Sequence, residues 1–229
     1  MSYQLEQEKF LMPSPAGAYY CISDAADNTA RGLLRQFLRQ EKVALVTNQQ
    51  VESWFTDEPE LGLKTLHYLQ NLGWLQTMEE GDQVSKAPLE DLLPELLEPL
   101  SSEGKALLTD SQGFCLSSTG FAHETAEEIS ALAADLVTLQ DRHKGLLSNN
   151  LKMPSVNWGL LDAAGHSQLG FWPLHIGSEM FSLVIAGAPC LQHQNFLQLT
   201  WILHNRYYTE SKTGEVDIVQ NRSRLSSSG

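Results

Sequence analysis

The stretch of sequence that decides the fold runs from Leu107 to Leu139 and reads LLTDSQGFCLSSTGFAHETAEEISALAADLVTL. Two short apolar runs are separated by Ser111-Gln112-Gly113 near its start: Lys105–Asp110, which begins two residues before the stretch, and Phe114–Ser118. Glycine tolerates the positive φ that a tight turn between antiparallel strands requires. The pattern therefore predicts a β-hairpin that leads into the segment after Gly120.

That segment, His123–His143, is predicted to be one long helix that ends before Gly145. Acidic side chains gather near its start and basic ones near its end, which is the order that the helix dipole favours. Its apolar residues repeat at helical spacing and form one broad stripe, which predicts that this side covers a sheet. The stripe consists of Ile129, Leu132, Ala133, Leu136, Val137 and Leu139.

The flanking sequence supplies the rest of a layered domain. A helix broken by prolines is predicted over Leu89–Leu100, and a closing helix over Gln192–Tyr208. Three further apolar runs are separated by short turns, and short turns imply antiparallel neighbours. These runs are Ser155–Asp162, Gln168–Ile176 and Met180–Ala186. The predicted fold class is therefore α+β, with a five-stranded antiparallel sheet that carries helices.

Residues 15–82 have a different order of elements. The predicted order is a strand, three helices and a second strand, and its spacing resembles the winged-helix family. These elements cover Ala18–Ser23, Ala30–Arg39, a short helix from Thr47 or Asn48 to Phe55, Pro59–Leu72 and Trp74–Met78.

Two changes in composition suggest domain limits. Glu79–Pro88 is polar, contains a glycine and ends at a proline, as linkers often do. After Tyr208 the chain becomes polar and ends in Ser-Ser-Ser-Gly. We therefore expect a winged-helix-like domain over residues 1–87, a layered domain over 88–209 and a mobile tail over 210–229.

Composition narrows the classes of function. The formal net charge of −13 disfavours binding to nucleic acid or to anionic membranes. Cys21, Cys115 and Cys190 are too few and too widely spaced for a disulfide framework or a cysteine zinc site. The amino terminus has no apolar signal core, and no apolar run of about 18 residues occurs. We expect a cytoplasmic protein with reduced thiols.

No motif of a catalytic or cofactor site is found. The sequence lacks GxSxG, GxGxxG and GxxxxGK[ST], so neither a nucleophile elbow nor a phosphate-cradling loop is predicted. His166 and His175 lie near Asp162 in the sequence, but their odd separation places the histidines on opposite sides of one strand. We therefore predict a non-enzymatic protein without a cofactor or a metal.

The hairpin and helix of Leu107–Leu139 resemble the roadblock (dynein light chain) superfamily, and the resemblance extends over residues 89–208. It rests on Asp110, Gly113, Ser117-Ser118, Gly120 and the helix rich in alanine and leucine that follows them. The resemblance implies a scaffold or regulator that dimerises through the long helix and the neighbouring edge strand. It also implies partners such as Ras-like small GTPases or a larger complex.

The residues expected at such an interface lie on the outward side of the helix and on the first strand after it. They are Glu128, Ala131, Asp135, Thr138, Arg142, Val156, Trp158 and Leu160. An ordinary solvated helix face is the alternative.

A second interface is conceivable along Arg31, Arg35 and Arg39, which form one stripe on their helix. Such a stripe could contact an acidic partner or a DNA backbone, although it is more often a solvated face. The alternative function is therefore a transcriptional regulator that binds DNA through the winged helix. Against it, the helix Pro59–Leu72 carries few of the basic side chains that groove-reading helices use.

Overall fold

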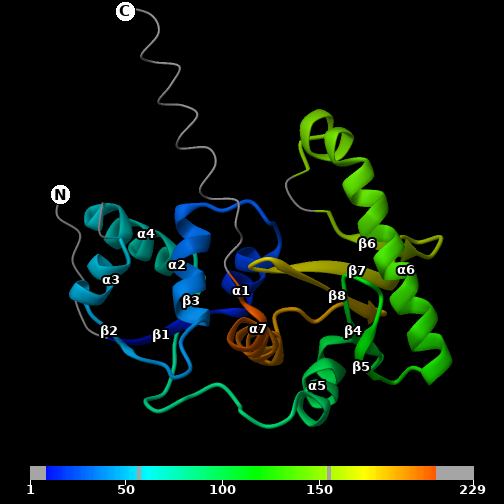
Figure 1. The fold of residues 1–229 in the computed structure, drawn as a ribbon, viewed down its shortest axis with the longest axis horizontal. Coiled ribbons are helices and arrows are strands. Elements are labelled where there is room, and N and C mark those ends of the chain that lie inside the picture. The colour runs from blue at the N-terminus through cyan, green and yellow to red at the C-terminus, as the bar shows by residue number, and fades with distance from the viewer. Residues whose placement is uncertain (1–8, 56–57, 154–155, 210–229) are drawn as a thin grey trace, which may run out of the picture.

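The computed structural model describes residues 9–55, 58–153 and 156–209. Two antiparallel sheets organise this part of the chain (Figure 1). The predicted tail, residues 210–229, lies outside the described residues. Among the described helices, none is both long and apolar enough to cross a membrane.

The larger sheet has five strands in the order β5-β4-β8-β7-β6, and every neighbouring pair is antiparallel. The predicted α+β class with a five-stranded antiparallel sheet is therefore confirmed. The strands are β4 (Ala106–Asp110), β5 (Cys115–Thr119), β6 (Trp158–Leu161), β7 (Ser167–Ile176) and β8 (Glu179–Ala186).

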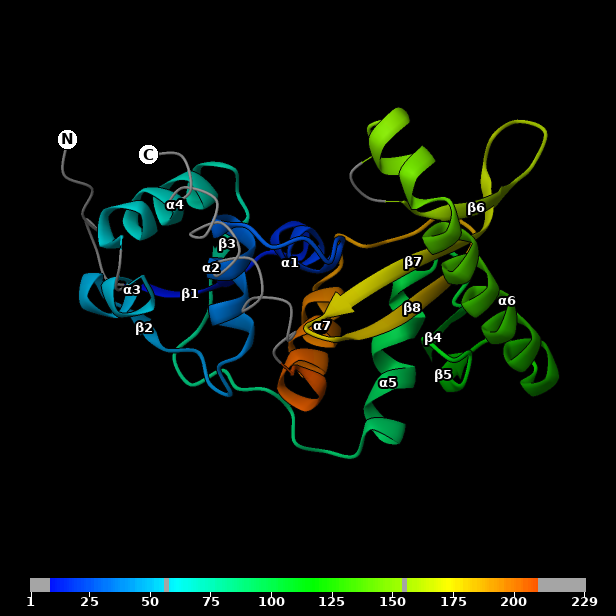
Figure 2. The same cartoon turned by 45° about the horizontal axis from the view of Figure 1, so that its top comes forward.

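The helices of residues 89–208 cover both faces of this sheet (Figure 2). The long helix α6 packs on one face, and α5 and α7 pack on the other. The break predicted in the helix after Leu89 is confirmed at Pro99, where a 3-10 turn follows α5, but not at Pro94, which lies inside α5. The elements are α5 (Leu89–Leu97), the 3-10 turn η1 (Glu98–Leu100), α6 (His123–Arg142), the π-helical turn η2 (Gly145–Asn150) and α7 (Gln194–Tyr207).

Strand alternation directs side chains to the two faces. Leu107 and Val184 belong to the cluster under α6, whereas their chain neighbours Leu108 and Leu183 belong to the core beneath α5 and α7. At the β4–β5 turn, Gly113 has φ +87°, as the sequence predicts, and Asp110 Oδ1 accepts hydrogen bonds from the backbone after it.

The amino-terminal part contains a three-stranded sheet and four helices among the residues described. Strand β1 lies between β2 and β3, although it precedes all the helices in the sequence. The winged-helix arrangement expected for residues 15–82 is therefore not confirmed. The elements are β1 (Lys9–Pro13), α1 (Pro15–Ile22), α2 (Thr29–Leu38), β2 (Leu45–Val46), α3 (Asn48–Trp54), α4 (Pro59–Asn71) and β3 (Leu75–Thr77).

The strand predicted over Ala18–Ser23 is wrong, because these residues belong to helix α1 and its carboxyl-terminal cap. Ser14 accepts a hydrogen bond from the Gly17 amide, and Pro15 occupies the first turn, where its fixed φ suits a helix. The buried residues Ala18, Cys21 and Ile22 follow helical spacing. The N-cap of α2 is Asn28, whose side chain accepts a hydrogen bond from the Arg31 amide.

Helix α7 joins the two parts of the chain. Trp201 Nε1 donates to the Gln40 carbonyl at 2.6 Å, and Asn205 Nδ2 donates to the Leu38 carbonyl at 2.8 Å. One continuous core cluster includes residues of α1 and α2 together with α5, α7 and the sheet. The predicted linker Glu79–Pro88 is also anchored, since Val84 is buried and its amide donates to the Glu41 carbonyl. The boundary near residue 87 stays a prediction.

Candidate protein-binding surface

Helix α6 lies close to the sheet because the residues it buries are small. Ala126, Ser130 and Ala133 are its buried positions, and the Ser130 hydroxyl donates to the Ala126 carbonyl within the helix. The larger apolar residues predicted for the inner stripe are only partly covered, and Leu132 is 41% exposed. The apolar stripe of α6 is thus only partly buried against the sheet.

The structure exposes the outward helix residues that the sequence singled out. Glu128, Ala131, Asp135, Thr138 and Arg142 are not among the buried positions of α6. Ala131 and Thr138 are small, so another backbone could approach the helix closely between the longer side chains.

Strand β6, beside this helix face, is an edge of the sheet, because it pairs only with β7 in the described part of the chain. Trp158 is half-buried and its Nε1 donates to Gln140 Oε1 of α6 at 3.3 Å, which ties the strand to the helix. Leu160 is 56% exposed and Leu161 is 63% exposed. Val156 is placed inward at 9% exposure, so it offers little surface to a partner.

Exposed apolar side chains are concentrated in this region. Of the twelve large hydrophobic residues that are exposed in the described chain, six lie between residues 132 and 161. Such clustering is more informative than scattered exposed leucines, which occur on every protein surface. The six are Leu132, Leu146, Leu151, Met153, Leu160 and Leu161.

We call the outer face of α6 together with β6 the α6–β6 surface. It comprises Glu128, Ala131, Leu132, Asp135, Thr138, Arg142, Trp158, Leu160 and Leu161.

The opposite edge of the sheet, β5, has a different character. Its residues Ser117, Ser118 and Thr119 are small, polar and half-buried, and α5 packs nearby. Leu116 on this strand is 37% exposed, and Phe114, at the turn before it, is 63% exposed. Both edges thus carry exposed apolar residues, and β5 differs from β6 in its row of small polar residues.

The arginine stripe of α2 is mostly a structural feature. Arg31 is 8% exposed, and its guanidinium donates to the carbonyls of Tyr20 and Ala26 at 3.1 and 3.0 Å. Arg35 forms a two-pronged ion pair with Asp27 at 3.0 and 3.2 Å. Arg39 is the most exposed residue of this stripe, and its guanidinium lies over the Tyr208 ring.

The histidines and the carboxylate considered for a metal are not brought together. His166 Nδ1 lies 3.2 Å from Asp162 Oδ2 in the exposed turn before β7, whereas His175 lies near the other end of that strand. Within residues 9–55, 58–153 and 156–209, no group of three possible metal ligands is found.

Burial is the main cause of the shifted pKa values of Cys21, His175 and His204. Burial raises the pKa of the Cys21 thiol to about 12, so this cysteine is a protonated core residue at neutral pH. Burial also lowers the pKa of His175, and it lowers the pKa of His204 to about 4. Each shift is thus caused mainly by burial, as is usual for groups that belong to a core.

No family model matches the chain, and no curated protein matches it. Solved structures that resemble it include a Roadblock/LC7 domain and MglB proteins. A Roadblock/LC7 domain from Streptomyces avermitilis matches 51% of this chain and 95% of its own, at 14% identity and TM-score 0.37. The gliding protein MglB from Thermus thermophilus matches 54% and 93%, at 16% identity and TM-score 0.35. An MglB with tetrameric arrangement matches 54% and 92%, at 17% identity and TM-score 0.35.

Each of these matches covers about half of this chain, with an identity below 20% and a TM-score below 0.5. We call residues 89–208 the roadblock-like half after the resemblance of their sequence.

Proposed function

We propose that this chain is a non-enzymatic adaptor or regulatory subunit that pairs with a second copy of itself, or with a related subunit, through the α6–β6 surface. The observation that carries the proposal is an unpaired edge strand next to an exposed apolar helix face. Unpaired backbone N–H and C=O groups of an edge strand invite pairing with another chain.

The size of the surface suits such an interface. Helix α6 has 20 residues and is therefore about 30 Å long. With β6 beside it, there is room for the roughly 800 Å² per partner that stable interfaces bury. The small residues Ala131 and Thr138 would allow close packing of two helices, and Leu132 and Leu160 would supply apolar contacts.

Sedimentation of the full chain tests the proposal. We expect a dimer for the wild type, and monomers for Ala131→Arg and Leu160→Asp, because each places a charge where a partner backbone or apolar surface must approach. Ala16→Arg and Leu61→Asp are matched controls, since both residues are exposed elsewhere. A wild-type monomer would contradict pairing of two identical chains, and dimers that persist in both α6–β6 variants would contradict pairing through this surface.

The roadblock resemblance further implies a Ras-like small GTPase or a larger complex as the regulated partner. The chain lacks a phosphate-cradling loop of its own, so its role would be to bind a GTPase and not to hydrolyse GTP. Purification of the full chain from its own host tests this part. A small GTPase that co-purifies in stoichiometric amount supports this part of the proposal. The absence of any small GTPase, with either GDP or GTP present, contradicts it.

DNA binding is not favoured by the structure. The exposed side of α4, the helix expected to read a groove, carries Glu60, Lys64 and His67. One lysine and one glutamate leave no net positive charge for phosphate contacts.

A further inference from the structure

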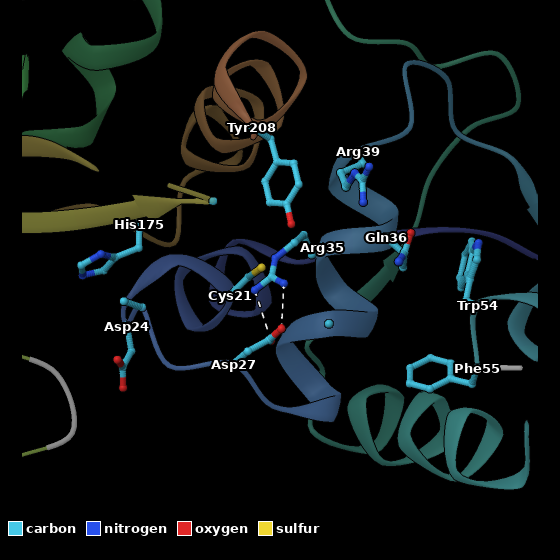
Figure 3. A pocket seen from close by; sticks show the side chains of 13 residues that line it. Cys21, Asp24, Asp27, Arg35, Gln36, Arg39, Trp54, Phe55, His175 and Tyr208 are labelled. Carbon is cyan, nitrogen blue, oxygen red and sulfur yellow. Dashed lines mark hydrogen bonds and ion pairs between the residues drawn. The ribbon is translucent and has the colours of Figure 1, made fainter. Parts of the chain in front are cut away.

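A groove of about 660 Å³ lies between α2 and the end of β7. Trp54 and Phe55 lie on one side of it and His175 on the other, with Arg35 and Tyr208 between them (Figure 3). The groove is separate from the α6–β6 surface, and the proposed pairing makes no use of it.

The described lining of the groove contains two arginines, Arg35 and Arg39, and two carboxylates, Asp24 and Asp27. Arg35 is paired with Asp27, and Arg39 is exposed. The guanidinium carbons of Arg35 and Arg39 lie 5.7 and 4.8 Å from the centre of the Tyr208 ring. Cationic groups next to the aromatic side chains Trp54, Phe55 and Tyr208 suit a ligand that is both acidic and apolar.

The last described residues of the chain are fixed at the rim of this groove. Thr209 pairs with Gly177, and the Ser178 amide donates to the Thr209 carbonyl at 3.1 Å. Gly177 has φ +64°, and a Cβ there would collide with the Thr209 carbonyl oxygen, so glycine allows this crossing. The chain therefore continues from Thr209 beside the groove.

The sequence that follows has the matching chemistry. Residues 214–220 read GEVDIVQ, in which acidic and β-branched residues alternate. In an extended segment, Glu215 and Asp217 would point to one side, and Val216 and Ile218 to the other. Eight residues separate Thr209 from Asp217 and span up to about 26–29 Å, which is ample to reach along a neighbouring groove.

We propose that residues 215–219 of this chain bind in the groove. Glu215 and Asp217 would meet the guanidinium groups of Arg35 and Arg39, and Val216 and Ile218 would pack against Trp54 and Phe55. The short tether raises the local concentration of this segment to the millimolar range, so even weak contacts would keep the groove occupied. An acidic segment of another protein would then have to displace it.

Backbone ¹⁵N relaxation of the full chain tests this proposal, with residues 225–228 of the same chain as an internal reference. We expect order parameters above about 0.6 for residues 215–219 and below that for residues 225–228. Two double variants test the contact: Arg35→Gln with Arg39→Gln, and Glu215→Gln with Asp217→Asn. Each should lower the order parameters of residues 215–219 to the level of residues 225–228. The tail variant changes no residue of the described fold, so its result does not depend on the stability of α2.

The matched control is Lys64→Gln with Lys105→Gln, which removes two positive charges from exposed positions elsewhere. It should leave the order parameters of residues 215–219 unchanged. Equal order parameters for the two sets in the wild type would overturn the proposal. A loss of order in only one of the two paired variants would also overturn it, since the carboxylates and the arginines would then act at different places.

Discussion

Helices α6 and α7 lie on opposite faces of one sheet, but they are buried to very different extents. Helix α6 buries three of its 20 residues, whereas α7 buries eight of its 14. The difference arises because α1 and α2 pack on the outer side of α7, while no described element covers the outer side of α6 (Figure 2). The chain thus covers the outer side of α7 with its own elements, whereas no described element covers the outer side of α6.

The largest expected difference between the two helices is in the free energy of unfolding. Leu199→Ala in α7 should cost about 2–5 kcal/mol, because Leu199 is fully buried and its removal leaves a cavity. Leu132→Ala in α6 removes the same atoms from a side chain that is 41% exposed, and it should cost less than about 1 kcal/mol. Denaturant unfolding of the monomeric protein measures the change in the free energy of unfolding for both variants. Equal changes would contradict the difference in burial between α6 and α7.

A pH effect is expected from α7 alone. Burial among α7 and its neighbours lowers the pKa of His204 from 6.5 to about 4, and its Nδ1 lies 2.9 Å from the Thr200 carbonyl. The unfolded chain therefore binds the proton more readily, so this group destabilises the fold as pH falls from about 6.5 towards 4, with a loss of about 2 kcal/mol by pH 5. His204→Gln should unfold with a correspondingly weaker dependence on pH over this range. If both proteins show the same slope, His204 is not held neutral by burial.

A smaller effect tests whether the amino-terminal part and the roadblock-like half unfold together. Asn28 caps α2 by accepting from the Arg31 amide at 2.9 Å, and Asn28→Ala should cost about 1 kcal/mol. If α7 and α2 share one core, calorimetry should show a single transition that shifts as a whole. Two transitions, of which only one moves, would instead support the predicted boundary near residue 87.

The sequence predicted the roadblock-like half well, because its elements depend on local patterns. The β4–β5 hairpin follows from Gly113, and the long helix follows from the apolar repeat of residues 129–139. The outward residues of α6 stay outside its buried set, as the periodicity requires. The antiparallel pairing of the later strands follows from the short turns between them.

Other features depend on tertiary contacts, and the sequence pattern did not reveal them. Strand β1 is only five residues long and is defined by pairing with β2 and β3 from distant parts of the chain. Arg31 has the spacing of a surface stripe, but its side chain is buried and donates hydrogen bonds to the carbonyl groups of Tyr20 and Ala26.

Two signals in the sequence could have improved the prediction. Ser14-Pro15 is a helix start, and it precedes the segment that was predicted as a strand. In α7, Leu197, Trp201 and Ile202 lie on other sides of the helix than Phe196, Leu199 and Leu203, and a helix that is apolar all round is usually buried. This pattern indicates that another part of the chain covers the outer side of α7.

The most direct test of the α6–β6 surface is hydrogen exchange of the two edge strands as a function of protein concentration. We predict that amides of β6 exchange more slowly as the concentration rises, because a second chain pairs with that edge, while amides of β5 keep a constant rate. Exchange at β6 that does not depend on concentration, or slowing at β5 alone, would contradict the proposal that β6 is the edge at which a partner binds.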